Sequence, residues 1–206
     1  MRRARTLLPP LLLAAACASG EAPPGEPVGT FAFVATLEPA AGETDRCTFA
    51  GAPARLTFDG SFSRDPATGA AWLQIDGTLR EGTLDGATFD MGLPRQPDGS
   101  TRLVPRRLSA CDCDLGFDES IVGRLLTGLA GGCEDLPPEE APGQATCPRL
   151  GEDGELAWDT CGSACGTLVE AVRPVSPCTC TVAGEEVPAP ATCSFVYRFE
   201  ARRIGG

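Results

Sequence analysis

Two Cys-x-Cys motifs have the residue type and the spacing to do chemistry, Cys111-Asp112-Cys113 and Cys178-Thr179-Cys180. Paired thiols carry out redox exchange or bind metal ions in other proteins. In a strand, residues i and i+2 point the same way, so the two cysteines of one motif face a common partner and are poorly placed to bond each other. We therefore expect the two motifs to lie side by side and to form structural disulfides, for example Cys111 and Cys113 with Cys178 and Cys180.

The remaining cysteines also favour a structural role. Cys161 and Cys165 have a Cys-x₃-Cys spacing, but a zinc site without histidine is weakly supported, and the Cys-x-x-Cys redox signature is absent. The chain has 11 cysteines, and setting Cys17 aside leaves an even number, which predicts a disulfide framework in an exported protein. The sequence leaves the connectivity open. The cysteines expected in disulfides are Cys47, Cys111, Cys113, Cys133, Cys147, Cys161, Cys165, Cys178, Cys180 and Cys193.

Charged residues form three groups that invite a binding site. The first acidic group lacks the glycine and glutamate positions of a calcium loop, since Gly116 and Gly123 fall at the wrong places. We interpret both acidic groups as solvated charge, the first also as the start of a helix, and predict no metal site. The arginines could meet lipopolysaccharide phosphates, but we expect them to pair with the chain's own carboxylates. The groups are Asp112, Asp114, Asp118 and Glu119; Glu152, Asp153, Glu155 and Asp159; and Arg95, Arg102, Arg106 and Arg107.

The composition excludes many kinds of catalysis. The chain contains no histidine, lysine or asparagine. It therefore has no Ser-His, Cys-His or His-metal mechanism and no Schiff-base lysine. The net charge of −11 disfavours binding to nucleic acid. We expect a protein that is not an enzyme, uses no cofactor and has no nucleic-acid partner.

The elements that must position these residues are mostly strands. From residue 30 to about 108, apolar and polar residues alternate and are interrupted by turn clusters, which predicts an antiparallel meander. A strong last strand over 193–203 can pair with the first strand and close the sheet. We expect a mainly β fold, an antiparallel meander closing as a sandwich or barrel, with disulfide-rich loops.

One helix is predicted at about 119–130. Asp118-Glu119-Ser120 is a suitable N-cap, and Gly131-Gly132 would end the helix. Between them the apolar residues recur at helical spacing. They are Ile121, Val122, Leu125, Leu126 and Leu129.

The N-terminus has the pattern of an export signal. Three arginines precede an apolar stretch over 7–16, which is too short to span a bilayer. The sequence Leu13-Ala14-Ala15-Ala16-Cys17 resembles the lipobox of bacterial lipoproteins. That resemblance implies that Cys17 is lipidated and becomes the mature N-terminus, and Ala18 after it favours the outer membrane. Ordinary secretory cleavage after Ala18, which would release the protein, is the alternative.

These patterns divide the chain into a signal peptide (1–16), a lipid anchor and flexible tether (17–29) and a single disulfide-stabilised β domain (30–206). The domain resembles only the Cys-rich lipoproteins of high-GC bacteria, and that resemblance implies no particular activity. Its only assigned partner is the membrane, through the lipid; a protein or small-molecule partner stays open.

Three functions fit this organisation. The first is a non-catalytic binding or structural role in the cell envelope, outer-membrane-anchored or secreted. The second is a calycin-like carrier of a small apolar ligand, with the inward phenylalanines lining the pocket. The third is a carboxylate-based enzyme, which needs two acids converging in a cleft. The phenylalanines are Phe31, Phe33, Phe58, Phe62 and Phe89.

Overall fold

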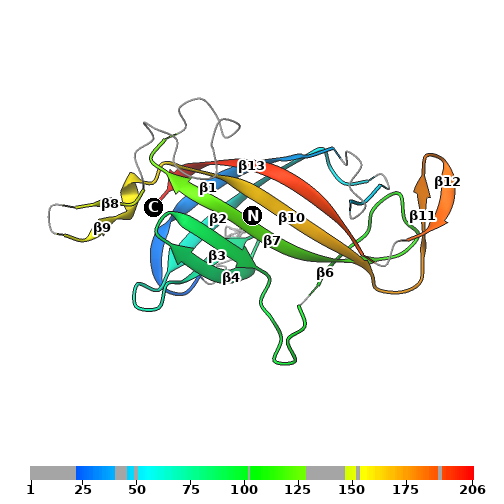
Figure 1. Ribbon diagram of the computed structural model, residues 1–206, viewed down its shortest axis with the longest axis horizontal. Helices are drawn as coiled ribbons and strands as arrows, with labels where there is room; N and C mark the ends of the chain where they lie inside the picture. The colour runs from blue at the N-terminus through cyan, green and yellow to red at the C-terminus, as the bar shows by residue number, and fades with distance from the viewer. Residues whose placement is uncertain are drawn as a thin grey trace, which may run out of the picture.

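A closed antiparallel barrel dominates the computed structural model, which describes residues 22–39, 46–48, 51–101, 103–128, 147–151, 154–189 and 192–206 (Figure 1). Eight strands form it, each paired with the next along the chain, and the last pairs with the first. The chain therefore follows a simple up-and-down path around the barrel. The strands are β1 (Glu26–Leu37), β2 (Arg55–Arg64), β3 (Ala70–Ile75), β4 (Thr78–Asp85), β5 (Thr88–Gly92), β7 (Leu115–Leu126), β10 (Ser163–Pro174) and β13 (Cys193–Gly205).

Short elements decorate the two ends of the barrel. A hairpin of β8 (Arg149–Leu150) and β9 (Leu156–Ala157) lies near the C-terminus, whereas a hairpin of β11 (Thr179–Val182) and β12 (Glu185–Pro188) lies at the opposite end (Figure 1). The strand β6 (Val104–Arg106) pairs with the beginning of β7. In the described part of the chain the 3₁₀ turn η2 (Trp158–Thr160) is the only helical element, and no helix there has the length and apolar character to cross a membrane.

Alternation of side chains explains why these residues form a barrel. Along β1, Phe31, Phe33 and Ala35 point inward and are buried, while the residues between them are less buried. In β13 every second residue points inward, and these inward residues include Tyr197 and Phe199. The register pairs Ala35 with Phe199, so the prediction that the first and last strands close the sheet is confirmed, as a barrel.

The predicted helix at about 119–130 is wrong, because residues 115–126 form β7. Glu119, Ile121 and Leu125 point inward at a spacing of two, whereas Val122 lies on the outer face with 45% of its surface exposed. Hydrogen-bonded neighbours on both sides, β5 and β10, fix this extended form. The apolar residues match both periods over this length, and tertiary pairing decides between them. Residues 129–130 lie outside the described residues.

Turns and pairings set three further strand boundaries. β3 and β4 are separated by a tight turn at Asp76-Gly77, where both residues have positive φ, as a two-residue hairpin requires. Between β5 and β7, the described residues form only the short strand β6. β1 begins at Glu26, inside the expected tether, because Glu26 and Pro27 pair with the end of β2.

One half of the barrel interior is solid. At the end where β1 begins, here called the closed end, Phe62 packs edge-on against Phe31 and Phe89, at centroid distances of 6.1 and 4.9 Å. Gly123 on β7 and Gly166 on β10 face each other and make room for the rings of Phe89 and Phe199. A Cβ at Gly123 would lie 2.5 Å from Phe89 Cζ, and one at Gly166 would lie 2.7 Å from Phe199 Cζ. Aromatic rings thus fill this end of the barrel; the opposite end is here called the mouth.

Candidate functional site

Four charged side chains meet inside the mouth of the barrel. Arg80 comes from β4, Arg106 from β6, Glu119 from β7 and Glu170 from β10, all at inward positions of the alternating pattern. Arg80, Glu119 and Glu170 expose only 6%, 7% and 3% of their surface. Charged side chains are almost never buried this deeply unless they are paired. These four residues are called the charge cluster below.

Arg80 anchors Glu119 on one side of the charge cluster. Its Nε donates to Glu119 Oε2 at 3.0 Å, and its Nη2 donates to the same oxygen. Its Nη1 donates to the carbonyl oxygens of Ile75 and Thr78, which flank the Asp76-Gly77 turn, at 3.2 and 2.8 Å. The tight turn thus holds the guanidinium, and the guanidinium fixes the carboxylate of Glu119.

Arg106 joins the two carboxylates. One terminal nitrogen, Nη2, donates to Glu119 Oε1, and the other, Nη1, donates to Glu170 Oε1 at 2.6 Å. The guanidinium also lies 4.3 Å from the ring centroid of Phe117. About a third of the Arg106 side chain, 34%, is exposed, so the cluster reaches solvent through this residue. Both oxygens of Glu119 therefore accept from arginines, whereas among the described residues only one oxygen of Glu170 does.

Glu170 and Tyr197 form the less satisfied side of the cluster. Burial raises the pKa of the Glu170 carboxyl, and the neighbouring Glu119 adds to the rise, while Arg106 and Arg80 oppose it. The hydroxyl of Tyr197 is buried without a hydrogen-bond partner. Burial, followed by the charge of Glu170, raises the pKa of Tyr197 to about 12, so the phenol stays protonated.

The charge cluster forms part of the wall of a cavity of about 330 Å³ at the mouth, here called the mouth pocket. Ligand-binding pockets in proteins start at about this size and combine apolar walls with a few polar groups. The mouth pocket has that composition. Besides the charge cluster, its walls contain the apolar residues Leu56, Phe58, Ile75, Val104, Ile121 and Leu168 and the polar residues Thr57, Asp76 and Thr78.

A larger hollow of about 710 Å³ lies on the outer surface, partly under the turn that bears Arg95 and Thr101. Its lining includes Glu81 and Asp90, which are exposed on the outer faces of β4 and β5. Solvated carboxylates of this kind are common on acidic proteins and need no ligand. We therefore place the candidate site in the smaller, more buried mouth pocket.

The phenylalanines expected to line a ligand pocket belong mostly to the solid core. Phe31, Phe33, Phe62 and Phe89 are at most 1% exposed. Of the five, Phe58 borders the mouth pocket, where its ring stacks on Phe33 at 4.9 Å. The pocket is therefore more polar than the sequence predicted.

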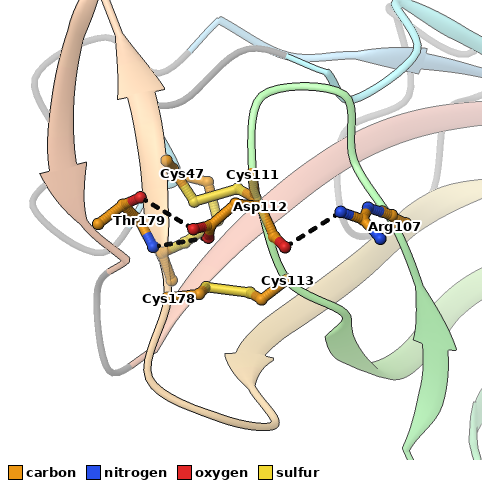
Figure 2. The surroundings of a disulfide bond; sticks show 9 residues. Cys47, Arg107, Cys111, Asp112, Cys113, Cys178 and Thr179 are labelled. Carbon is orange, nitrogen blue, oxygen red and sulfur yellow. Dashed lines mark hydrogen bonds between the residues drawn. A yellow bond between two sulfur atoms is a disulfide. The ribbon is translucent and has the colours of Figure 1, made fainter.

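The cysteines within the described residues are in disulfides. The two Cys-x-Cys motifs bond each other, Cys111 with Cys180 and Cys113 with Cys178 (Figure 2). Further bonds join Cys47 to Cys193 and Cys147 to Cys161, and Cys165 is also disulfide-bonded. Cys133 and the predicted lipidation site Cys17 lie outside the described residues.

The pair of disulfides Cys111–Cys180 and Cys113–Cys178, here called the clip, ties the segment after β6 to β11. Between the two bonds, the Asp112 carboxylate accepts hydrogen bonds from the backbone nitrogen of Thr179 at 2.9 Å and from its hydroxyl at 3.3 Å (Figure 2). Arg107 Nη2 donates to the Asp112 carbonyl oxygen at 3.1 Å. Arg106 directly precedes this segment, so the clip helps to hold Arg106 over the mouth.

The clip also accounts for the one group of metal-ligand types among the described residues. Asp112, Cys113 and Cys178 bring their ligand atoms within 4.8 Å of one another. The two sulfur atoms, however, are bonded to each other and offer no thiolate. The group therefore has a structural role. The same holds for Cys161 of the Cys-x₃-Cys motif, because its sulfur is bonded to Cys147.

The structure separates the charged groups that the sequence placed together. Asp112 belongs to the clip, Asp118 lies on the outer face of β7, and Glu119 is inside the barrel. Glu119 was therefore wrongly interpreted as solvated charge. Arg95 lies in the turn after β5, while Arg102, Glu152 and Asp153 lie outside the described residues.

Sequence reasoning missed Arg80, Glu170 and Tyr197 as site residues. Each occupies an inward position of a strand, and for Glu170 the signal was available, since it lies between the buried Leu168 and Val172. A carboxylate at an inward position of an alternating strand indicates a buried polar site, provided that the strand itself is recognised.

No family model, curated protein or solved structure matches this chain. The fold defines its class as a closed eight-stranded up-and-down barrel with a polar mouth pocket. Its function is therefore argued from the geometry of the mouth.

Proposed function

We propose that the protein is a non-catalytic binding protein of the cell envelope, which holds a small ligand in the mouth pocket. Barrels of eight antiparallel strands are wide enough to pack side chains in part of the interior and to hold one small ligand in the rest. The solid closed end and the cavity of about 330 Å³ at the mouth fit that division. This proposal is a form of the calycin-like carrier that the sequence suggested as an alternative, but its binding site contains polar groups.

The observation that carries the proposal is the buried charge cluster beside the cavity. Buried ion pairs contribute little to stability, because the desolvation of two charges offsets most of their attraction. Well-packed apolar residues would fill the same space with no loss of stability. Desolvated charges beside a pocket, with perturbed pKa values, are instead typical of functional sites.

The N-terminal sequence and the disulfides support a location in the cell envelope. Disulfides persist in oxidising compartments, which suits an exported protein. Lipidation at Cys17 would attach the protein to the outer membrane, with secretion as the alternative. β1 enters the barrel at the closed end, so a chain anchored upstream of β1 would leave the mouth directed away from the lipid. Palmitate labelling that is lost in Cys17→Ser tests the anchor.

A second candidate function is acid–base catalysis, because Glu119 and Glu170 converge on Arg106. Catalysis of this kind usually needs two carboxyl groups with different protonation states. Arginines hold both oxygens of Glu119, which leaves Glu170 as the one carboxyl group of the pair with a free oxygen. We therefore favour binding over catalysis.

Native mass spectrometry tests the binding function. The protein is isolated without denaturation from cells that export it, together with Leu168→Trp, which fills the mouth pocket, and Val122→Trp, which adds the same side chain to the outer face of the barrel. We expect a bound small molecule on the wild type and on Val122→Trp but not on Leu168→Trp. A wild type without any adduct, or an adduct that Leu168→Trp retains, contradicts the proposal.

A further inference from the structure

We propose that the mouth pocket selects a small amphipathic ammonium compound, whose charged nitrogen binds Glu170 and whose apolar body lies against Leu56, Phe58 and Ile75. This inference rests on the binding function proposed above and adds the chemical class of the ligand.

Glu170 provides the charge cluster with a free hydrogen-bond acceptor. Glu170 Oε1 is bonded to Arg106, whereas Oε2 makes no hydrogen bond to a described residue. Oε2 is also not among the buried atoms that lack a partner, so it opens onto the pocket that Glu170 lines. An ionised carboxylate only accepts hydrogen bonds, and its strongest partners are cationic N–H donors.

The charge balance of the pocket points the same way. The two guanidinium groups of the cluster are matched by Glu119 and Glu170, and Asp76 at the rim adds a further carboxylate. Arg80 donates its hydrogen bonds to Glu119 and to two backbone carbonyl oxygens. An anionic ligand would therefore meet two guanidinium groups that are already paired with carboxylates and an excess of negative charge, whereas a cation would be attracted, also by the net charge of −11 of the chain.

The walls set the shape of the rest of the ligand. Apolar side chains from β2, β3, β6, β7 and β10 line part of the cavity, which favours a ligand with an apolar body. A volume of about 330 Å³ accommodates an aromatic ring or a short alkyl chain with its ammonium group, and excludes a full-length lipid. Phe58 offers a ring face near the entry, to which a cation is also attracted.

The orphan hydroxyl of Tyr197 is an independent sign of a missing polar partner. It is fully buried and has no hydrogen-bond partner, a situation that typically costs about 1–3 kcal/mol. It lies close enough to Glu170 for that charge to raise its pKa.

The affinity should depend on pH through Glu170. The charged or titratable groups that face it are Arg106 from β6, Glu119 from β7, Arg80 from β4 and Tyr197 from β13. Since burial raises the Glu170 pKa, acidification protonates this carboxyl earlier than an exposed glutamate. Ammonium binding should then weaken as the pH falls, and binding of an uncharged analogue should not.

Calorimetric titration with three probes of one skeleton tests the inference: 2-phenylethylammonium, 2-phenylethanol and 3-phenylpropanoate. At about pH 8 and low salt the ammonium group is charged, since its pKa is about 10. We expect the ammonium probe to bind about tenfold more tightly than the alcohol, which is the usual gain from a charged hydrogen bond, and the carboxylate probe to bind most weakly.

Glu170→Gln should abolish the tenfold preference, because the ammonium group loses its countercharge. Glu81→Gln, which removes the same charge from the outer face of β4, should leave the preference intact. Circular dichroism shows whether each variant folds, and the pH dependence of the wild-type preference gives the same information without a variant. Equal binding of alcohol and ammonium, or tighter binding of the carboxylate, overturns the ligand class but leaves the binding function standing. No binding of any probe, together with no native adduct, overturns both.

Discussion

At Glu119, two guanidinium groups from different strands hold both oxygens of one buried carboxylate. Arg80 connects it to β4, and Arg106 connects it to the short β6 and onward to Glu170 on β10. The residue therefore links three parts of the barrel wall around the mouth pocket.

Replacing Glu119 by glutamine should destabilise the protein strongly. The change leaves Arg80, which is 6% exposed, without its countercharge, and breaking a buried ion pair in this way typically costs about 3–5 kcal/mol. Urea denaturation followed by circular dichroism measures the loss. The exposed Glu81→Gln is the matched control and should leave the free energy of unfolding unchanged. A loss below about 1 kcal/mol would show that the pair is not buried as described.

Glu170 should make stability fall with rising pH. Its pKa in the folded protein lies above the ordinary value of 4.5, because burial penalises the charged form. The protonated carboxyl therefore favours folding, and this contribution is complete below the unfolded pKa and is lost as the pH rises through the folded pKa. Relative to Glu170→Gln, the wild type should become less stable from acidic to neutral pH. A difference in unfolding free energy that stays constant with pH would contradict the raised pKa.

Among single residues, the sequence identified cysteines better than charges. A Cys-x-Cys spacing restricts where the two sulfur atoms point, so a side-by-side disulfide pair could be expected for Cys111, Cys113, Cys178 and Cys180. The charge cluster could not be predicted as a unit, because Arg80 and Glu170 meet only when strands distant in the sequence close into one wall.

Strands of this barrel are defined by their neighbours as much as by their own residues. The meander from β1 to β5 could be predicted, since its strands alternate and are joined by short turns. β7 could not, because its apolar residues fit a helix equally well, and only pairing with β5 and β10 makes the extended form stable.

The two disulfides of the clip should contribute unequally to the free energy of unfolding, and each contribution should depend on which bond is removed first. With Cys111–Cys180 intact, Cys113–Cys178 closes only a small ring, so Cys113→Ala with Cys178→Ala should cost about 2 kcal/mol in the chain-entropy model. Removing the second bond then opens a loop with a sequence separation of 69 residues and should cost about 4 kcal/mol more. Urea denaturation of the double and quadruple variants measures both steps. Equal steps would contradict this account.

Gly166→Ala should weaken the pairing between β7 and β10, here called the seam. A Cβ there would lie 2.1 Å from the Val122 carbonyl oxygen, which belongs to the backbone and cannot move aside. Overpacking of this kind costs about 3 kcal/mol. Gly128→Ala, where a Cβ meets nothing within 4 Å, is the control. Thermal unfolding compares the two, and equal melting temperatures would mean that the seam is looser than described.

The whole molecule has two unlike ends. The closed end is filled by aromatic rings and receives the chain from the N-terminal side, while the mouth carries the pocket, the charge cluster and the clip. An anchored protein of this shape would present its binding site away from the lipid. The barrel and its closure could be predicted from alternation, whereas the division into two ends depends on which inward residues share a layer, which the sequence does not show.

Nuclear magnetic resonance can locate the ligand in the mouth pocket, by following the backbone amide signals while 2-phenylethylammonium is added. We expect shifts that saturate and that cluster around the mouth pocket, at Phe58, Ile75, Leu168 and Glu170, while Phe31 and Phe89 at the closed end stay unchanged. Shifts confined to the outer face around Trp72 and Asp90, or no shifts at all, would contradict it.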